Sequence, residues 1–108
     1  QVVFHGYVGR ELTLEQGIQA ARLCALNALA VLKEHLGDLN RVKRIVKVTG
    51  WVRSAQGFQE QHLVINGFSD LMVQVFGERG RHARSAVAAN ELPLGTPVEV
   101  EMIVEVED

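Results

Sequence analysis

The chain has 108 residues, a formal net charge of −2, 47% hydrophobic and 22% charged residues, which suits one globular domain with an ordinary core. This composition excludes a disordered chain, and no apolar run approaches the ~18 residues of a membrane span. The near balance of 11 basic and 13 acidic residues disfavours a nucleic-acid partner. We therefore expect one domain over residues 1–108, with neither a nucleic-acid nor a membrane partner.

Cys24 is the single cysteine, which excludes an internal disulfide and a cysteine-only metal site. His5, His35 and His62 show no metal-ligand spacing with acidic residues or with Cys24, so we expect no metal. An unpaired thiol fits a reducing compartment, and we expect a cytoplasmic protein.

The first half of the chain predicts a strand end, a long helix and a charged strand. Residues 2–4 (VVF) indicate the end of a strand. Thr13 and Gln16 form a capping box, and Gly37 provides a helix stop. Between them an apolar stripe with steps of three and four predicts a largely covered helix. Its members are Leu14, Ile18, Ala21, Ala25, Ala28, Leu32 and Leu36.

Residues 41–53 change to a period of two, which predicts a strand. The expected buried face holds Val42, Val46, Val48 and Val52. The expected outer face holds Arg41, Lys43, Ile45, Lys47, Thr49, Trp51 and Arg53. This strand should therefore place valines toward helices and basic groups outward.

The second half predicts a helix and two strands. Residues 57–76 show a helical stripe that ends at Gly77, with His62, Ile65, Ser69 and Met72 on its face. Residues 82–89 indicate a strand of small residues. Residues 98–106 alternate apolar side chains with glutamates, interrupted by Ile103.

Opposite charges on the strands at 41–53 and 98–106 indicate that these strands are neighbours in one sheet. Their shared charged face, with Ile45, Trp51 and Ile103, is either an oligomer surface or a solvated face. The element order predicts an α+β two-layer domain with a mixed sheet and two helices on one of its faces.

Three segments resemble the RidA/YjgF-like family, also called the L-PSP endoribonuclease family. The first joins residues 23–29 (LCALNAL) to 36–42 (LGDLNRV), and the second is 46–52 (VKVTGWV). The third is 83–87 (ARSAV), followed by Leu92-Pro93 and by 98–101 (VEVE). The loop at 76–82 (FGERGRH) resembles that of a divergent branch of the family.

The resemblance implies a chorismate-mutase-like fold and a homotrimer with a barrel-like centre and small-molecule clefts between subunits. It implies hydrolysis of reactive enamine and imine intermediates to 2-oxo acids and ammonia, without a cofactor. It also implies a strand upstream of Gln1 that would complete the cleft.

By resemblance, Arg84 matches the arginine that grips the substrate carboxylate, Glu99 the glutamate near the attacking water, and Asn66 an asparagine near the cleft. Ala86 stands where the family often has cysteine, within the substrate-binding segment.

The residues themselves leave alternatives. An arginine among small residues can present two parallel hydrogen bonds to a carboxylate, but Arg84 could equally be a structural partner of a glutamate. Glu99 and Glu101 share one face and cannot be told apart. His82 shares the strand parity of Arg84 and either lines the cleft or only ends a loop. A triad of Ser85, His82 and Asp70 has no support in its context.

Three functions follow from these considerations: an imine/enamine deaminase, a non-catalytic binder of small carboxylates such as 2-oxo acids, and a ribonuclease. The ribonuclease is disfavoured because the chain lacks a basic excess and interleaved aromatic residues.

Overall fold

The computed structural model describes residues 4–107, which form two long helices and three strands. In chain order these are α1 (Leu14–Leu36), β1 (Val42–Arg53), α2 (Gln61–Phe76), β2 (Ala83–Ala89) and β3 (Val98–Val106). Short 3-10 turns lie at Leu39–Arg41, Gly77–Gly80 and Pro93–Gly95. Of the strand predicted at residues 2–4, positions 2 and 3 lie outside the described residues, and Phe4 is not in a strand.

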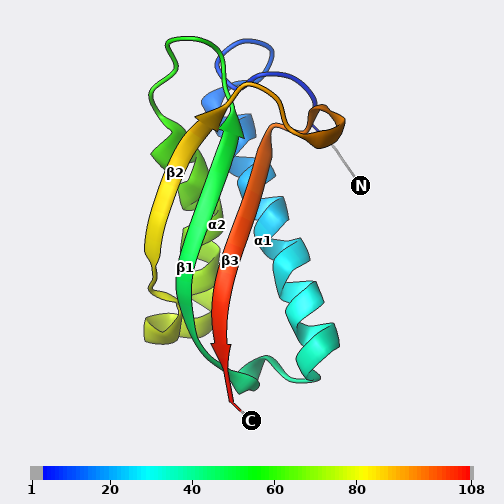
Figure 1. The fold of residues 1–108 in the computed structure, drawn as a ribbon, viewed down its shortest axis with the longest axis vertical. Coiled ribbons are helices and arrows are strands. Elements are labelled where there is room, and N and C mark those ends of the chain that lie inside the picture. Colours follow the sequence, from blue (N-terminus) through cyan, green and yellow to red (C-terminus); the bar gives the residue numbers. More distant parts are fainter. Residues whose placement is uncertain (1–3, 108) are drawn as a thin grey trace.

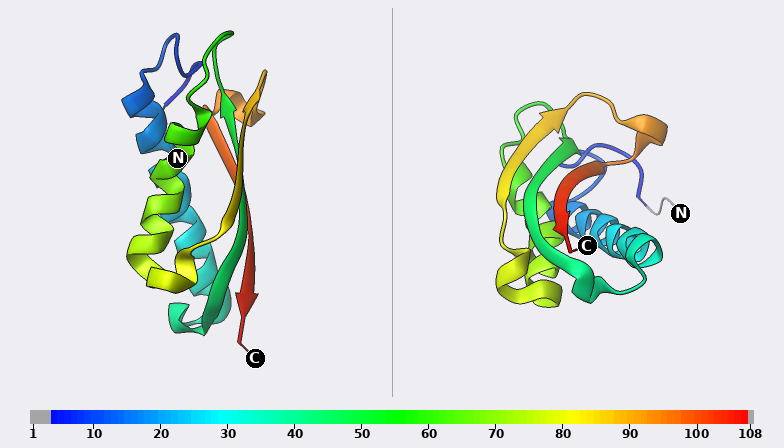
Figure 2. Two further views of the ribbon diagram at one scale, coloured as in Figure 1. Left: turned by 90° about the vertical axis from the view of Figure 1, so that its left-hand side faces the viewer. Right: turned by 60° about the horizontal axis from the view of Figure 1, so that its bottom comes forward.

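The strands form one mixed sheet in the order β2-β1-β3 (Figure 1). β1 runs parallel to β2 and antiparallel to β3. Both helices cover the same face of this sheet and leave the other face open (Figure 2). The predicted α+β two-layer architecture is therefore confirmed, as is the pairing of the two charged strands.

The predicted start and end of α1 are confirmed. The backbone N–H of Gln16 donates to Thr13 Oγ1 at 3.1 Å, and the N–H of Thr13 donates to Gln16 Oε1 at 2.9 Å. Gly37 follows the helix with φ of 81°, a conformation that favours glycine.

The expectation that α1 is largely covered is wrong. Leu23, Leu26 and Val31 are 38%, 47% and 57% exposed. The sheet ends at β3, so no further described element covers the far side of the helix (Figure 2). Apolar side chains are therefore left on the surface of α1, and Val31 among them lies beside the β3 edge.

The predicted faces of β1 are partly wrong because the strand is irregular. Its register against β3 shifts between Val42 and Arg44 and again between Ile45 and Lys47. Each shift is a bulge that moves the following residues to the opposite face. Ile45 is consequently fully buried beneath the helices, whereas Ile103 lies on the outer face and is 58% exposed.

The expected ladder of ion pairs between β1 and β3 forms at only one point among residues 4–107. Glu105 pairs with Arg44 at 3.0 Å and with Lys43 at 3.8 Å. The register instead places Trp51 beside Glu99, and Arg53 pairs with Glu91 beyond the sheet.

Helix α2 begins at Gln61, four residues later than predicted, and its buried face differs from the expected stripe. The buried side chains are Val64, Ile65, Phe68, Leu71, Met72 and Phe76. His62 and Ser69 lie outside this face. Ser69 is half-buried at the margin of α2, on the side toward β2. Within the described part of the chain, no helix is long and apolar enough to cross a membrane.

Candidate functional site

Arg84 points from β2 toward the helices. It pairs in register with Val48, which is fully buried under α2, and residues directly opposite on neighbouring strands share a face. Its Nη1 donates to Asn66 Oδ1 at 2.7 Å and to Ser69 Oγ at 3.3 Å. Asn66 and Ser69 are three residues apart on α2, so both face the same strand.

These side chains line a hollow of about 250 Å³ between α2 and the start of β2. Its walls are Asn66, Ser69, Asp70, Val73, Arg81, His82 and Arg84. The structure therefore brings together three of the predicted site residues: Arg84, Asn66 and His82.

No ion pair within residues 4–107 includes Arg84. The interpretation of Arg84 as the partner of a glutamate thus finds no support in the structure. Both of its hydrogen bonds use Nη1, and both go to uncharged oxygens. A guanidinium that is half-buried and not neutralised by a carboxylate is suited to bind a carboxylate from outside.

His82 is held on both sides of its ring. Its Nδ1 lies 2.5 Å from the carbonyl oxygen of Gly80, and its Nε2 lies 2.9 Å from Ser69 Oγ. Of the two interpretations of His82, the structure supports the one in which it lines the hollow. Sequence reasoning did not identify Ser69 as its partner. The sequence held one indirect signal for Ser69: it follows Asn66 by three residues, and this spacing places two side chains on the same face of a helix.

Two predicted residues lie elsewhere. Glu99 pairs in register with Trp51 and is on the outer face of the sheet, opposite to Arg84. Ala86 is on the helix side beside Gly50, where it packs against the core rather than lining the hollow. The structure thus does not bring Glu99 to Arg84 within one chain.

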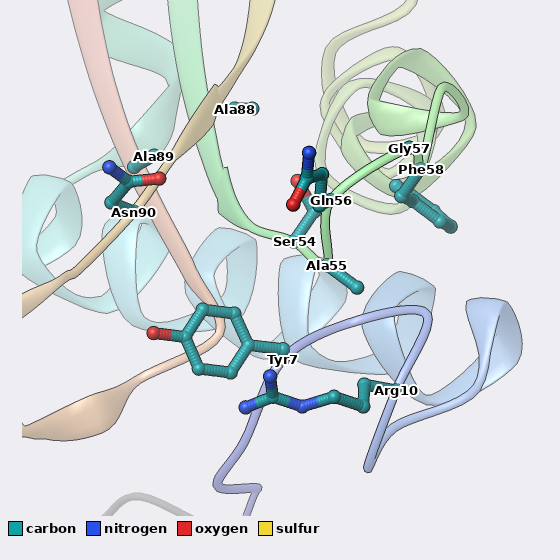
Figure 3. Close-up of a pocket in the computed structure, with 10 residues that line it drawn as sticks. All are labelled: Tyr7, Arg10, Ser54, Ala55, Gln56, Gly57, Phe58, Ala88, Ala89 and Asn90. Atoms are coloured by element: carbon teal, nitrogen blue, oxygen red, sulfur yellow. The ribbon is translucent and has the colours of Figure 1, made fainter.

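A larger hollow of about 580 Å³ lies between the N-terminal loop, the β1–α2 loop and the end of β2. Figure 3 shows Arg10 running alongside the Tyr7 ring, with Gln56 and Asn90 on the other side of the space. None of the residues that line it was predicted from the sequence to belong to a site.

The charged groups at this second hollow are already paired. Arg53 and Arg10 lie over the Tyr7 ring, 3.8 and 4.3 Å from its centre. Arg53 pairs with Glu91 at 3.0 Å, and Arg10 with Glu11 at 2.6 Å. Any anionic ligand here would have to compete with those carboxylates.

Hydrogen bonding at the same hollow shifts two pKa values. The Tyr7 hydroxyl donates to Glu91 Oε2 at 2.7 Å. This bond raises the pKa of Tyr7, and together with Arg53 it lowers the pKa of Glu91. The charged side chains at this larger hollow are thus paired with one another, whereas no ion pair among residues 4–107 includes Arg84. We therefore place the candidate site at Arg84. Among the residues that the structure describes, no group of three His, Cys, Asp or Glu side chains could hold a metal ion.

The comparisons with known proteins agree with the fold. Residues 1–106 match the family described as "YjgF/chorismate_mutase-like, putative endoribonuclease". The chain belongs to this YjgF-like family. It is 50% identical over 101 residues to "Protein TCP17" of Trypanosoma cruzi, a match that covers 93% of the chain and 63% of that protein.

Two solved structures resemble this YjgF-family chain closely. The protein Atu1372 of Agrobacterium tumefaciens, of unknown function, has a TM-score of 0.98 and 46% identity, with 100% of this chain and 69% of that one covered. A "putative endoribonuclease" of Shewanella oneidensis has a TM-score of 0.94 and 34% identity, with 98% and 70% covered. The chain thus spans less than two thirds of the Trypanosoma protein and about 70% of the two bacterial ones.

Proposed function

We propose that this YjgF-family protein hydrolyses reactive enamine and imine intermediates to 2-oxo acids and ammonia, with Arg84 holding the substrate carboxylate. The observation that carries the proposal is a half-buried guanidinium in a hollow, with hydrogen bonds only to the neutral Asn66 and Ser69. These two bonds hold the guanidinium in place before a ligand arrives, which lowers the entropic cost of binding.

Glu99 is the proposed group that holds the attacking water. Since it lies on the opposite face of the sheet from Arg84, it can take this role only at the Arg84 of a neighbouring copy. The proposal therefore includes a homotrimer with its sites between subunits, as the family resemblance implies. The exposed Ile103 and Val87 on the outer face are compatible with such an interface.

The test generates 2-aminoacrylate from serine with a threonine dehydratase in the presence of semicarbazide. Semicarbazide intercepts the imine, so an imine hydrolase should lower imine trapping and speed the release of pyruvate. We expect Arg84→Ala to abolish this acceleration and Arg84→Lys to restore little of it, because lysine cannot form the two parallel bonds. Arg22→Ala, at an exposed position of α1, is the matched control. If the parent protein does not speed the release of pyruvate, the deaminase function is refuted.

The second candidate is a binder of small carboxylates without turnover. The position of Glu99 favours it, because a single chain offers a ligand site at Arg84 without the glutamate that is proposed to hold the water. Calorimetry with pyruvate distinguishes the two functions: binding that requires Arg84, together with no acceleration of hydrolysis, supports the binder. A parallel incubation with single-stranded RNA tests the ribonuclease, for which we expect no cleavage.

A further inference from the structure

A continuous chain of hydrogen bonds leads from the backbone to Arg84 through His82 and Ser69. The Gly80 carbonyl can only accept, so Nδ1 of His82 carries a hydrogen. In the neutral ring Nε2 is then the acceptor, and the Ser69 hydroxyl donates to it at 2.9 Å. Ser69 Oγ in turn accepts from Arg84 Nη1 at 3.3 Å.

The backbone group that orients His82 is held firmly. Gly80 is buried against α2, and a Cβ at this position would overlap the carbonyl group of Met72. Only glycine can therefore approach α2 so closely. This contact fixes the Gly80 carbonyl, and the carbonyl fixes which ring nitrogen faces Ser69.

The hydroxyl of Ser69 thus lies beside the imidazole of His82, which can act as a base, and the Gly80 carbonyl orients that imidazole. Such a hydroxyl can pass a proton between a reacting molecule and the imidazole behind it. Ser69 lies on the wall of the hollow next to Arg84, whereas Glu99 is on the other side of the sheet. Within one chain, the Ser69 hydroxyl and the imidazole behind it thus lie beside the guanidinium that would hold the substrate carboxylate.

We propose that Ser69 and His82 form the proton relay of the Arg84 site. The inference rests on the proposed deaminase function. Water adds to the carbon of the protonated imine, and the C=N π electrons move to nitrogen. The proton that the water loses passes to Ser69 Oγ while the Ser69 proton passes to His82 Nε2.

The relay then runs in reverse. The imidazolium returns its proton through Ser69 to the amine nitrogen of the tetrahedral adduct. The C–N bond breaks, its electron pair leaves with ammonia, and the hydroxyl oxygen forms the carbonyl. The hydroxyl proton departs with the ammonia, so one iminium and one water give one 2-oxo acid and one ammonium ion.

The relay predicts different kinetic effects at Ser69 and at Arg84. With an imino acid generated at increasing flux by an amino-acid oxidase, we expect Ser69→Ala and His82→Gln to lower kcat about 100-fold. His82→Gln should leave KM and the calorimetric affinity for pyruvate within about twofold of the parent, whereas Ser69→Ala, which also removes a hydrogen bond to Arg84 Nη1, should weaken that affinity only modestly. Arg84→Ala should instead weaken pyruvate binding by at least about tenfold.

Two further readouts exclude a merely structural effect. Ser69→Thr keeps a hydroxyl and should retain most of kcat. The fall of kcat toward acid pH should be lost in His82→Gln, because the group whose protonation blocks the relay is gone. The charged groups facing this imidazole are Asp70, Arg81 and Arg84.

If the parent accelerates imine hydrolysis and both Ser69→Ala and His82→Gln keep its kcat, the relay is refuted while the deaminase stands. If the parent does not accelerate it, both proposals fall together.

Discussion

Arg84 and Glu99 lie on opposite faces of the three-stranded sheet and on its two outer strands. Arg84 is beside Val48 on the helix-covered face, and Glu99 is beside Trp51 on the open face. Because β1 separates the two strands, no side-chain rotation can bring these groups together in one chain. Any site that uses both must therefore combine two copies.

The proposed deaminase site, shared between subunits, predicts complementation between two inactive variants. Arg84→Ala and Glu99→Ala should each lose imine hydrolysis when assayed alone. The two variants are mixed in equal amounts, unfolded and refolded together. Closed trimers that assemble at random would then have both native residues at about a quarter of their sites, so we expect about a quarter of the parent activity. The same mixture without refolding is the control. A refolded mixture that stays inactive would argue against shared sites.

Gly67 on α2 lies against the backbone of α1, so we expect a side chain at this position to lower the stability of the fold. A Cβ at this position would overlap the backbone carbonyl of Ile18 on α1. We expect Gly67→Ala to lower the free energy of unfolding by about 1–3 kcal/mol because the helices must separate. The exposed Gln74→Ala on the same helix should stay within about 0.5 kcal/mol of the parent. Urea unfolding of both variants checks this, and equal stability would show that the helices shift without cost.

Glu91 should make the free energy of unfolding depend on pH in the acid range. The Tyr7 hydroxyl and the Arg53 guanidinium lower its pKa in the folded chain. Its contribution is therefore complete above the ordinary glutamate pKa of about 4.3 and is lost as the pH falls through the lower folded value. Glu91→Gln should remove this part of the acid destabilisation. Thermal unfolding from pH 7 to pH 3 measures it, with the exposed Glu34→Gln as control, and an unchanged slope in Glu91→Gln would contradict the assignment.

Cys24 should react slowly with alkylating reagents. Burial raises the pKa of its thiol, and the nearby charge of Glu99 raises it further. Less thiolate is then present at neutral pH than in a free cysteine, and only the thiolate reacts. We expect iodoacetamide to modify Cys24 more slowly than glutathione at pH 7.5, and Glu99→Gln to increase the rate modestly. A rate equal to that of glutathione would show that the thiol is fully accessible.

Local patterns predicted those elements whose cause is local. The capping box at Thr13 and Gln16 and the glycine stop at Gly37 gave α1 its observed bounds, because each depends on residues within one helical turn. The alternation of valine and glutamate likewise placed β3 at residues 98–106. The faces of β1 were predicted less well, because its bulges depend on pairing with a strand more than 50 residues away in the sequence.

The sequence by itself determined the two-layer architecture, the family and the choice of Arg84, since periodicity and short motifs are properties of neighbouring residues. Only the tertiary structure decided that Ser69 joins His82 and Arg84 and that Glu99 faces away from them. Those relationships depend on how α2 packs over β2 and on strand register, and a shift of one residue reverses the face on which a side chain lies.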